Sequence, residues 1–355
     1  MKNIIKTLIV MLTSVSLFSA AQAGDLNVSG TAKATYNIQS GYTSAGKGLG
    51  VTNELNFTAS GELDNGYTWS YSMELDPGAN DSTNNSADND DTKLTMTTPY
   101  GTVGVFVLEG GLDAEDAASQ SVYSRPTDMG DPSATVDNYT IDAYNNIQFH
   151  TPADLLPFAT TVKVAYAPGL DGTNNSGNGQ GAARAQASAT YVGASAQEVR
   201  VDSEPVDGLK IGASYFEFEG GGVNKNDQTA ESGAAFATYA IGGITAGYSR
   251  GVRTALLADG TTSAGATTVE YYDQENISAA FAVNDDLSVS YERETSELNY
   301  ATSTTAKIEQ QSKALQAAYT MGGMTLAISH AKHENNGYVE VNDTQQTLFA
   351  VTMAF

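Results

Sequence analysis

The chain has no cysteine, only three histidines and few basic residues. Without cysteine, disulfides, thiolate metal sites and redox-active thiols are excluded. Lysine and arginine number 17 against 41 aspartates and glutamates, which gives a formal net charge of −24. Nucleic acid is excluded as a partner, because phosphate binding needs a basic surface. A phosphate-binding Gly-x4-Gly-Lys-Ser/Thr motif is absent and three histidines leave few Ser/His pairs, so we expect no enzyme activity.

Long hydrophobic runs are missing beyond the N-terminal region. Residues 1–23 contain a basic start, an apolar stretch from Thr7 to Ala20, and the small-x-small sequence Ala21-Gln22-Ala23. This order is typical of a secretory signal peptide, and its apolar stretch is shorter than the ~20 residues of a membrane-spanning helix. We expect cleavage after Ala23 and a single mature domain over residues 24–355, without a transmembrane helix.

Alternating polarity recurs from end to end of the mature chain. In residues 67–76, Tyr, Trp, Tyr, Met and Leu alternate with Thr, Ser, Ser, Glu and Asp. Residues 348–355 alternate likewise and end on the aromatic Phe355. Successive side chains of a strand point to opposite faces, so each segment predicts a β-strand with one apolar face. Tyrosine and phenylalanine recur near segment ends, as in the aromatic girdles of membrane barrels.

The connections between these segments alternate between short and long. Seven short turns are expected near residues 64–66, 99–101, 153–158, 204–208, 241–243, 284–286 and 321–323. Eight longer polar loops are expected near residues 40–50, 77–91, 109–141, 168–196, 219–230, 252–267, 299–306 and 333–343. Fifteen connections join sixteen strands, and this sorting of turns and loops is typical of bacterial outer-membrane barrels.

We therefore predict an all-β fold, a sixteen-stranded antiparallel transmembrane β-barrel with short periplasmic turns and long extracellular loops. Hydrocarbon tolerates no unpaired sheet edge, so the strand that ends at Phe355 must pair with the strand that begins near Asp25. About sixteen strands leave an aqueous lumen, whereas about eight would be filled by side chains. The expected location is the outer membrane of a Gram-negative bacterium.

A resemblance to a known family rests on three features: the Ala21-Gln22-Ala23 signal end, the C-terminal Phe355, and a third loop that opens Leu-Glu-Gly-Gly-Leu-Asp at residues 108–113. With these the chain resembles the general porins of Gram-negative bacteria, which are sixteen-stranded trimeric diffusion channels. The resemblance implies a homotrimer and a third loop that folds into the barrel and narrows the pore. It also implies that the outer-membrane assembly machinery reads Phe355 as an address.

The third loop, about residues 109–141, is the longest loop and is strongly acidic, and loops of this length are usually functional. We expect its carboxylates to form the acidic wall of a pore constriction that favours cations. The candidates are Asp113, Glu115, Asp116, Glu109, Asp128 and Asp131. The first three rank highest, because the family's loop turns inward early. The simpler alternative is that these acids are solvated loop residues.

The opposite wall of the constriction is expected to be basic. Alternation places Lys33, Lys93, Lys163 and Arg200 on the polar, lumen-facing side of the strands. Opposed acidic and basic walls create a transverse field that orders water and penalises apolar solutes. The predicted function is a passive, water-filled diffusion channel for small hydrophilic solutes and ions, with a preference for cations.

The expected partners are outer-membrane lipid and lipopolysaccharide, the assembly machinery, and the passing solutes. Neither a cofactor nor a metal site is expected, although acidic loops such as residues 81–91 could bind Ca²⁺ weakly through oxygen ligands. Three alternative functions remain open. One is a substrate-specific channel of the same fold, another is a secreted, β-rich surface adhesin, and the third is an outer-membrane enzyme.

Overall fold

A computed structural model describes residues 25–41, 45–77, 87–129, 137–169, 195–219, 229–255, 269–301 and 306–355. The predicted signal peptide and the candidate Asp131 lie outside these residues, as do residues 81–86 of the acidic stretch 81–91. Within the described part of the chain, no helix has the length and apolar character needed to cross a membrane.

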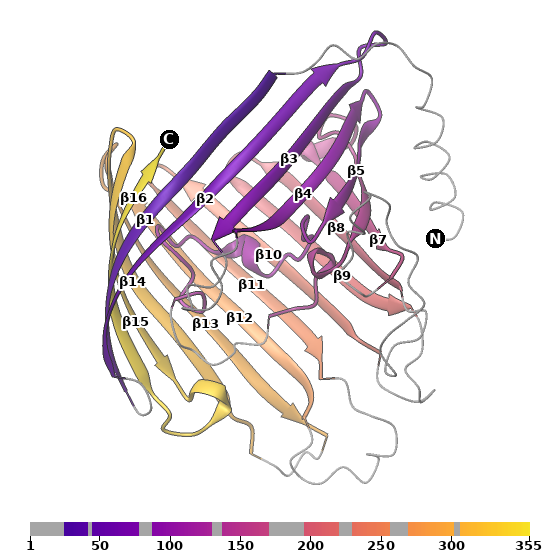
Figure 1. The fold of residues 1–355 in the computed structure, drawn as a ribbon. Helices are drawn as coiled ribbons and strands as arrows, with labels where there is room; N and C mark the ends of the chain where they lie inside the picture. Colours follow the sequence, from indigo (N-terminus) through magenta and orange to yellow (C-terminus); the bar gives the residue numbers. More distant parts are fainter. Residues whose placement is uncertain are drawn as a thin grey trace.

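The described residues form a closed barrel of sixteen antiparallel strands, in which each strand pairs with its sequence neighbours and β1 pairs with β16. Figure 1 shows the tilted strands around one lumen. The strands are β1 (Asp25–Gly41), β2 (Gly46–Glu62), β3 (Thr68–Pro77), β4 (Ala87–Thr98), β5 (Gly101–Val107), β6 (Asn146–His150), β7 (Thr161–Ala167), β8 (Ser195–Val206), β9 (Leu209–Glu219), β10 (Glu231–Ile241), β11 (Ile244–Thr254), β12 (Val269–Ala282), β13 (Leu287–Tyr300), β14 (Glu309–Met321), β15 (Met324–Glu334) and β16 (Thr344–Ala354). The predicted fold class and strand number are confirmed.

All seven predicted short turns join consecutive strands at one end of the barrel. The first long loop differs from its expected range of residues 40–50, because β1 continues to Gly41 and β2 already begins at Gly46. The glycines of residues 46–50 therefore lie within β2 and not at a loop tip. Alternation fails in this glycine-rich stretch, so the sequence pattern missed the first residues of the strand.

The polarity of the barrel is the reverse of that of a water-soluble core. Among the described residues, the buried set includes many polar side chains of β12–β16, such as Gln274, Ser290, Glu292, Gln310 and Ser329. Large apolar side chains are exposed on the other face, as the alternation predicts: on β16, Phe349 is 43% and Met353 is 51% exposed. An apolar exterior and a polar interior are what a barrel in hydrocarbon requires.

The barrel closes through the first and last strands. Lys33 lies opposite Thr352 and Tyr36 opposite Phe349. Gly30 and Phe355 exchange two backbone hydrogen bonds, of 2.8 and 3.0 Å. A Cβ atom at Gly30 would lie 2.5 Å from the Glu54 carbonyl oxygen, so glycine is needed where three strands approach closely. The terminal carbonyl and amide groups thereby belong to the hydrogen-bonded sheet.

Candidate functional site

The connection between β5 and β6 lies inside the barrel, where it forms the candidate site (Figure 1). We call residues 108–145 the inner segment; its described parts contain the 3₁₀ turns η1 (Asp116–Ala118) and η2 (Ile141–Ala143). Leu108 and Gly110 have positive φ angles of 54° and 85°, which turn the chain away from the sheet.

Side chains on the lumen face of the strands hold the backbone of the inner segment. The Ala114 amide donates to Ser214 Oγ of β9 at 2.9 Å, and the Tyr123 amide donates to Gln316 Oε1 of β14 at 2.9 Å. Further along, the amide of Gln346 on β16 donates to the Met129 carbonyl. These contacts dock the described inner segment along the wall from β9 to β16.

One glycine of β11 permits the closest approach of the inner segment to the wall. A Cβ atom at Gly247 would overlap the Ala118 carbonyl oxygen. Residues 247–251 read Gly-Tyr-Ser-Arg-Gly, which matches the serine-hydrolase pattern Gly-x-Ser-x-Gly. That pattern requires an exposed serine on a strand-to-helix turn, whereas Ser249 lies within a strand, is fully buried and donates to the Glu115 carbonyl at 2.6 Å. Gly247 and Ser249 therefore serve to pack the inner segment against β11.

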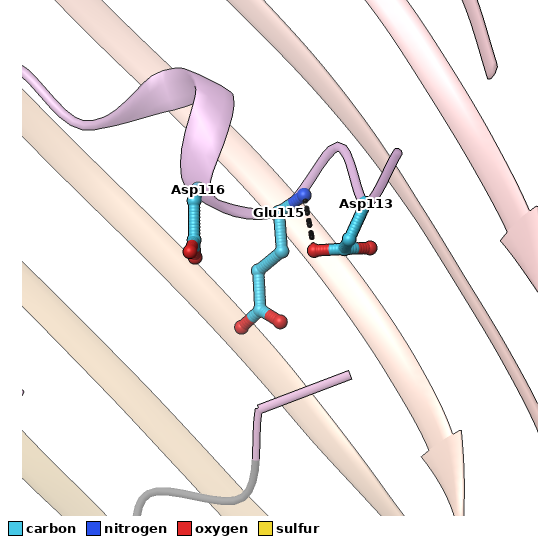
Figure 2. Close-up of side chains that lie close together, drawn as sticks. All are labelled: Asp113, Glu115 and Asp116. Atoms are coloured by element: carbon cyan, nitrogen blue, oxygen red, sulfur yellow. Dashed lines mark hydrogen bonds between the residues drawn. The ribbon is translucent and has the colours of Figure 1, made fainter. Parts of the chain in front are cut away.

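Three predicted acids converge where the inner segment enters η1. Asp113, Glu115 and Asp116 each bring a carboxylate oxygen within 4.8 Å of the others (Figure 2). Asp113 Oδ2 accepts a hydrogen bond of 2.9 Å from the Glu115 amide, and its Oδ1 accepts one of 3.1 Å from Ser214 Oγ. Carboxylates at this spacing repel one another when ionised, and they offer the oxygen ligands that Ca²⁺ prefers.

Burial and mutual repulsion raise the pKa values of two acids of this cluster. Burial, followed by repulsion from Asp113 and Asp116, raises the pKa of Glu115 well above its usual value. Burial raises the pKa of Asp116 to about 7, although the nearby Arg125 opposes that rise. The Asp116 side chain is 54% exposed inside the barrel. The charge of the cluster therefore changes near neutral pH.

Arg125 neutralises the acidic cluster from within the inner segment. Its guanidinium forms ion pairs of 2.6 Å with Asp116, 2.7 Å with Glu294 and 3.6 Å with Asp137. Burial by itself lowers the pKa of Arg125, but the carboxylates, Glu294 first, outweigh that effect and raise it. The side chain is only 13% exposed and Glu294 only 5%, so a permanently charged arginine ties the inner segment to β13.

The predicted acids take different positions. Asp116 and Asp128 are exposed to the lumen, Asp113 is half-buried, and Glu109 forms an ion pair with Lys93. Glu115 does not line open space as expected, because the residue is only 9% exposed and its carboxylate accepts a hydrogen bond of 3.3 Å from the Asn138 amide of the same inner segment. Alternation carries no information on side-chain direction in an irregular segment.

The four predicted basic residues all lie on the lumen face, but they form no single wall. The Lys33 ammonium lies 5.9 Å from the centroid of the Tyr123 ring of the inner segment. Lys163 and Arg200 both pair with Asp202 of β8, at 3.7 and 2.8 Å. Arg200 also donates to the Asp113 carbonyl at 2.7 Å. Arg200 of β8 therefore holds the backbone of the inner segment against the wall. Lys33 and Lys93 lie on other strands, β1 and β4.

Sequence reasoning missed the carboxylates of the barrel wall that anchor the inner segment. Glu292 accepts hydrogen bonds from Ser119 Oγ at 2.7 Å and from Ser121 Oγ at 2.6 Å. Glu294 accepts them from Thr127 and Arg125. A sequence signal for them exists: Glu292 and Glu294 are two positions apart in β13, so alternation places both on its polar, lumen-facing side.

Glu198 of β8 fastens the two ends of the inner segment together. Its Oε2 accepts hydrogen bonds from the Leu112 amide at 3.3 Å and from the Ile141 amide at 2.8 Å. We expect Glu198→Ala to weaken the docking of the inner segment by about 2 kcal/mol or more, because each buried donor left unpaired costs ~1–3 kcal/mol. Hydrogen exchange at the Leu112 and Ile141 amides measures this weakening and should become faster. Unchanged exchange would show that Glu198 does not hold the two ends of the inner segment together.

The chain matches a sequence model described as Gram-negative porin over residues 7–355. No curated protein sequence matches it. Solved structures that are similar include Salmonella typhi OmpF in complex with daunomycin, with 12% identity, a TM-score of 0.63, and coverage of 94% of this chain and 98% of that chain.

Two further structures agree with it in fold. In vitro folded OmpT of Vibrio cholerae is 13% identical, with a TM-score of 0.62 and coverage of 96% of this chain and 99% of that chain. A mutant of Rh. blastica porin is 14% identical, with a TM-score of 0.59 and coverage of 93% and 100%. At these identities the similarity establishes a shared barrel.

Proposed function

Since the chain belongs to the Gram-negative porin family, we propose that it is a passive, cation-preferring diffusion channel whose pore is narrowed by the inner segment. Its location is the outer membrane, where such proteins let small hydrophilic solutes through. The mechanism is filtering by size and charge, without a chemical step or a resident cofactor. A divalent cation such as Ca²⁺ would be a transient occupant of the Asp113–Asp116 cluster.

One observation supports the cation preference: the inner segment carries exposed carboxylates inside the barrel. The side chains of Asp116 and Asp137 are 54% and 61% exposed, and Asp128 is exposed beside them. Only Arg125 of the inner segment balances them within its described residues. Acidic groups along a pore raise the local concentration of cations and oppose anions.

The reversal potential of the purified protein in a planar bilayer under a KCl gradient tests this proposal. We expect cation selectivity, and we expect Asp116→Asn/Asp128→Asn to reduce the permeability ratio by up to about fivefold, because a unit charge ~4 Å away contributes about 1 kcal/mol in water. Asp285→Asn/Asp286→Asn, which removes two exposed acids from the β12–β13 turn, is the matched control. Anion selectivity, or equal effects of the two variants, would contradict the acidic constriction.

A homotrimer and an assembly signal at Phe355 complete the proposal. One of the similar structures is described as a trimer form of Vibrio cholerae OmpT. The outer faces of β2 and β4 carry strongly exposed apolar residues, with Leu49 at 85%, Val51 at 65% and Leu94 at 54%, which suits contact with neighbouring subunits. Conductance steps that occur in groups of three in the same bilayer recording would support the trimer.

A second candidate, a substrate-specific channel, is favoured by a lateral pocket at the short-turn side of the inner segment. The pocket has a volume of about 620 Å³, and Arg200, Asp202, Lys210 and Phe236 line it. Lys210 forms no ion pair with any described residue, so its ammonium is available to a carboxylate or phosphate. Conductance that saturates with an added anionic solute would favour this function, and linear conductance would favour simple diffusion.

A further inference from the structure

Three basic residues form a ladder on the outer face of the barrel. Arg293 of β13 lies directly opposite Lys313 of β14, and Lys313 lies directly opposite Lys332 of β15. Their side chains are 36%, 32% and 44% exposed. Glu294 and Ser312, the next residues along two of these strands, are buried on the lumen side, so alternation directs the basic side chains outward. We call these three residues the basic ladder.

Fewer carboxylates than cations form ion pairs within the basic ladder. Glu334 is shared by Lys313 and Lys332, at 3.2 and 2.6 Å, and Glu275 pairs with Arg293 at 3.1 Å. Among the described residues, two carboxylates therefore pair with three cations, and Asp343 acts on Lys332 only without an ion pair, in a chain whose formal net charge is −24. Like charges directly opposite each other on adjacent strands are destabilising. An additional anion would relieve this repulsion.

An apolar surface lies beside the basic ladder on the same strands. Two residues nearer the short-turn end, Tyr291 is 46% and Leu315 is 63% exposed, and Ile328 of β15 is 41% exposed. On the outer face of β13, Leu287, Val289 and Tyr291 precede Arg293, whereas Thr295 and Glu297 follow it toward the long loops. The basic ladder thus lies where the apolar outer face gives way to polar residues, at the level of the outer headgroups.

We propose that the basic ladder binds the phosphate groups of a phosphorylated lipid in the outer leaflet, whose acyl chains lie along Tyr291, Leu315 and Ile328. Lysine and arginine form their strongest hydrogen bonds with phosphate and carboxylate oxygens, and their long stems reach out from an apolar surface. Charge complementarity and the adjoining apolar surface together match a lipid with an anionic head. This inference depends on the outer-membrane location and not on the proposed ion selectivity.

Lipid A with both phosphates, and lipid A from which the phosphates have been removed, are the probes. Each is titrated into the detergent-solubilised protein at low salt, and the lipid-bound fraction is measured by native mass spectrometry. We expect tighter binding of the phosphorylated form, and we expect Lys313→Gln/Lys332→Gln to weaken it about tenfold, because charged hydrogen bonds contribute ~1.5–3 kcal/mol. The control Lys47→Gln/Lys163→Gln removes the same charge from strands away from β13–β15 and should leave binding unchanged.

A variant that is expected to strengthen lipid binding tests whether the lysine substitutions weaken binding merely by damaging the protein. Glu334→Gln frees two lysines from their carboxylate, so it should tighten the binding of phosphorylated lipid A. Equal binding of the two lipids, equal effects of the lysine variant and its control, or unchanged affinity after Glu334→Gln would each overturn the proposal. Loss of subunit assembly in the lysine variant with unchanged lipid binding would overturn it too, in favour of contact with a second copy.

Discussion

Replacement of Arg125 by methionine is expected to release the inner segment from the barrel wall. The substitution leaves Glu294, which is 5% exposed, without its guanidinium partner at 2.7 Å, and it also breaks the pair with Asp116. Removal of one member of a buried ion pair costs ~3–5 kcal/mol, because the remaining charge stays desolvated. Hydrogen exchange of the Thr127 amide, which donates to Glu294 at 3.0 Å, should accelerate, and single-channel conductance should rise.

Two variants control this prediction. Arg250→Met breaks the pair of 2.6 Å with Asp273 on the outer face, away from the inner segment, so it should leave the exchange of Thr127 and the conductance unchanged. Arg125→Met/Glu294→Met should recover most of the lost stability, because a buried ion pair can be replaced by apolar side chains at little cost. If Arg125→Met left exchange and conductance unchanged, Arg125 would not hold the inner segment in place.

The second large effect is expected from pH. Acidification from pH 8 to pH 6 should lower the cation preference with a midpoint near 7, because burial raises the pKa of Asp116 to about 7. Below this value the carboxyl group is neutral, while Arg125 keeps its charge. The reversal potential recorded at several pH values measures the change. In Asp116→Asn, the change in cation preference near pH 7 should disappear. A selectivity that stays constant from pH 6 to pH 8 in the unmodified protein would contradict it.

The same titration has a consequence for stability. A carboxyl group whose pKa is higher in the folded protein than in the unfolded chain binds protons more tightly when folded. The docked inner segment should therefore lose stability as pH rises from about 4 to about 7, with the full loss present above 7. Glu115 adds to this loss, because burial raises its pKa in the same direction. Urea unfolding at pH 5 and pH 8 would detect the difference.

The fold could be predicted from the sequence because a barrel strand carries its own signal. In β3 and β16, alternation alone separates the lumen face from the lipid face, and glycine or asparagine marks the turns between strands. The glycine-rich start of β2 was missed, since residues 46–50 have no alternation. In the candidate site the lumen-facing basic residues follow from the same rule, as Lys93 and Arg200 illustrate.

The sequence by itself determined the barrel, the strand number, its outward apolar face and the acidic character of the inner segment. Only the tertiary structure decided that Glu115 is buried, that Arg125 reaches Glu294, and that Glu198 joins the two ends of the inner segment. Strand alternation is a local property of two successive residues, whereas these contacts join residues more than 50 positions apart. Their formation depends on the path of an irregular chain through a closed lumen, and no periodicity encodes that path.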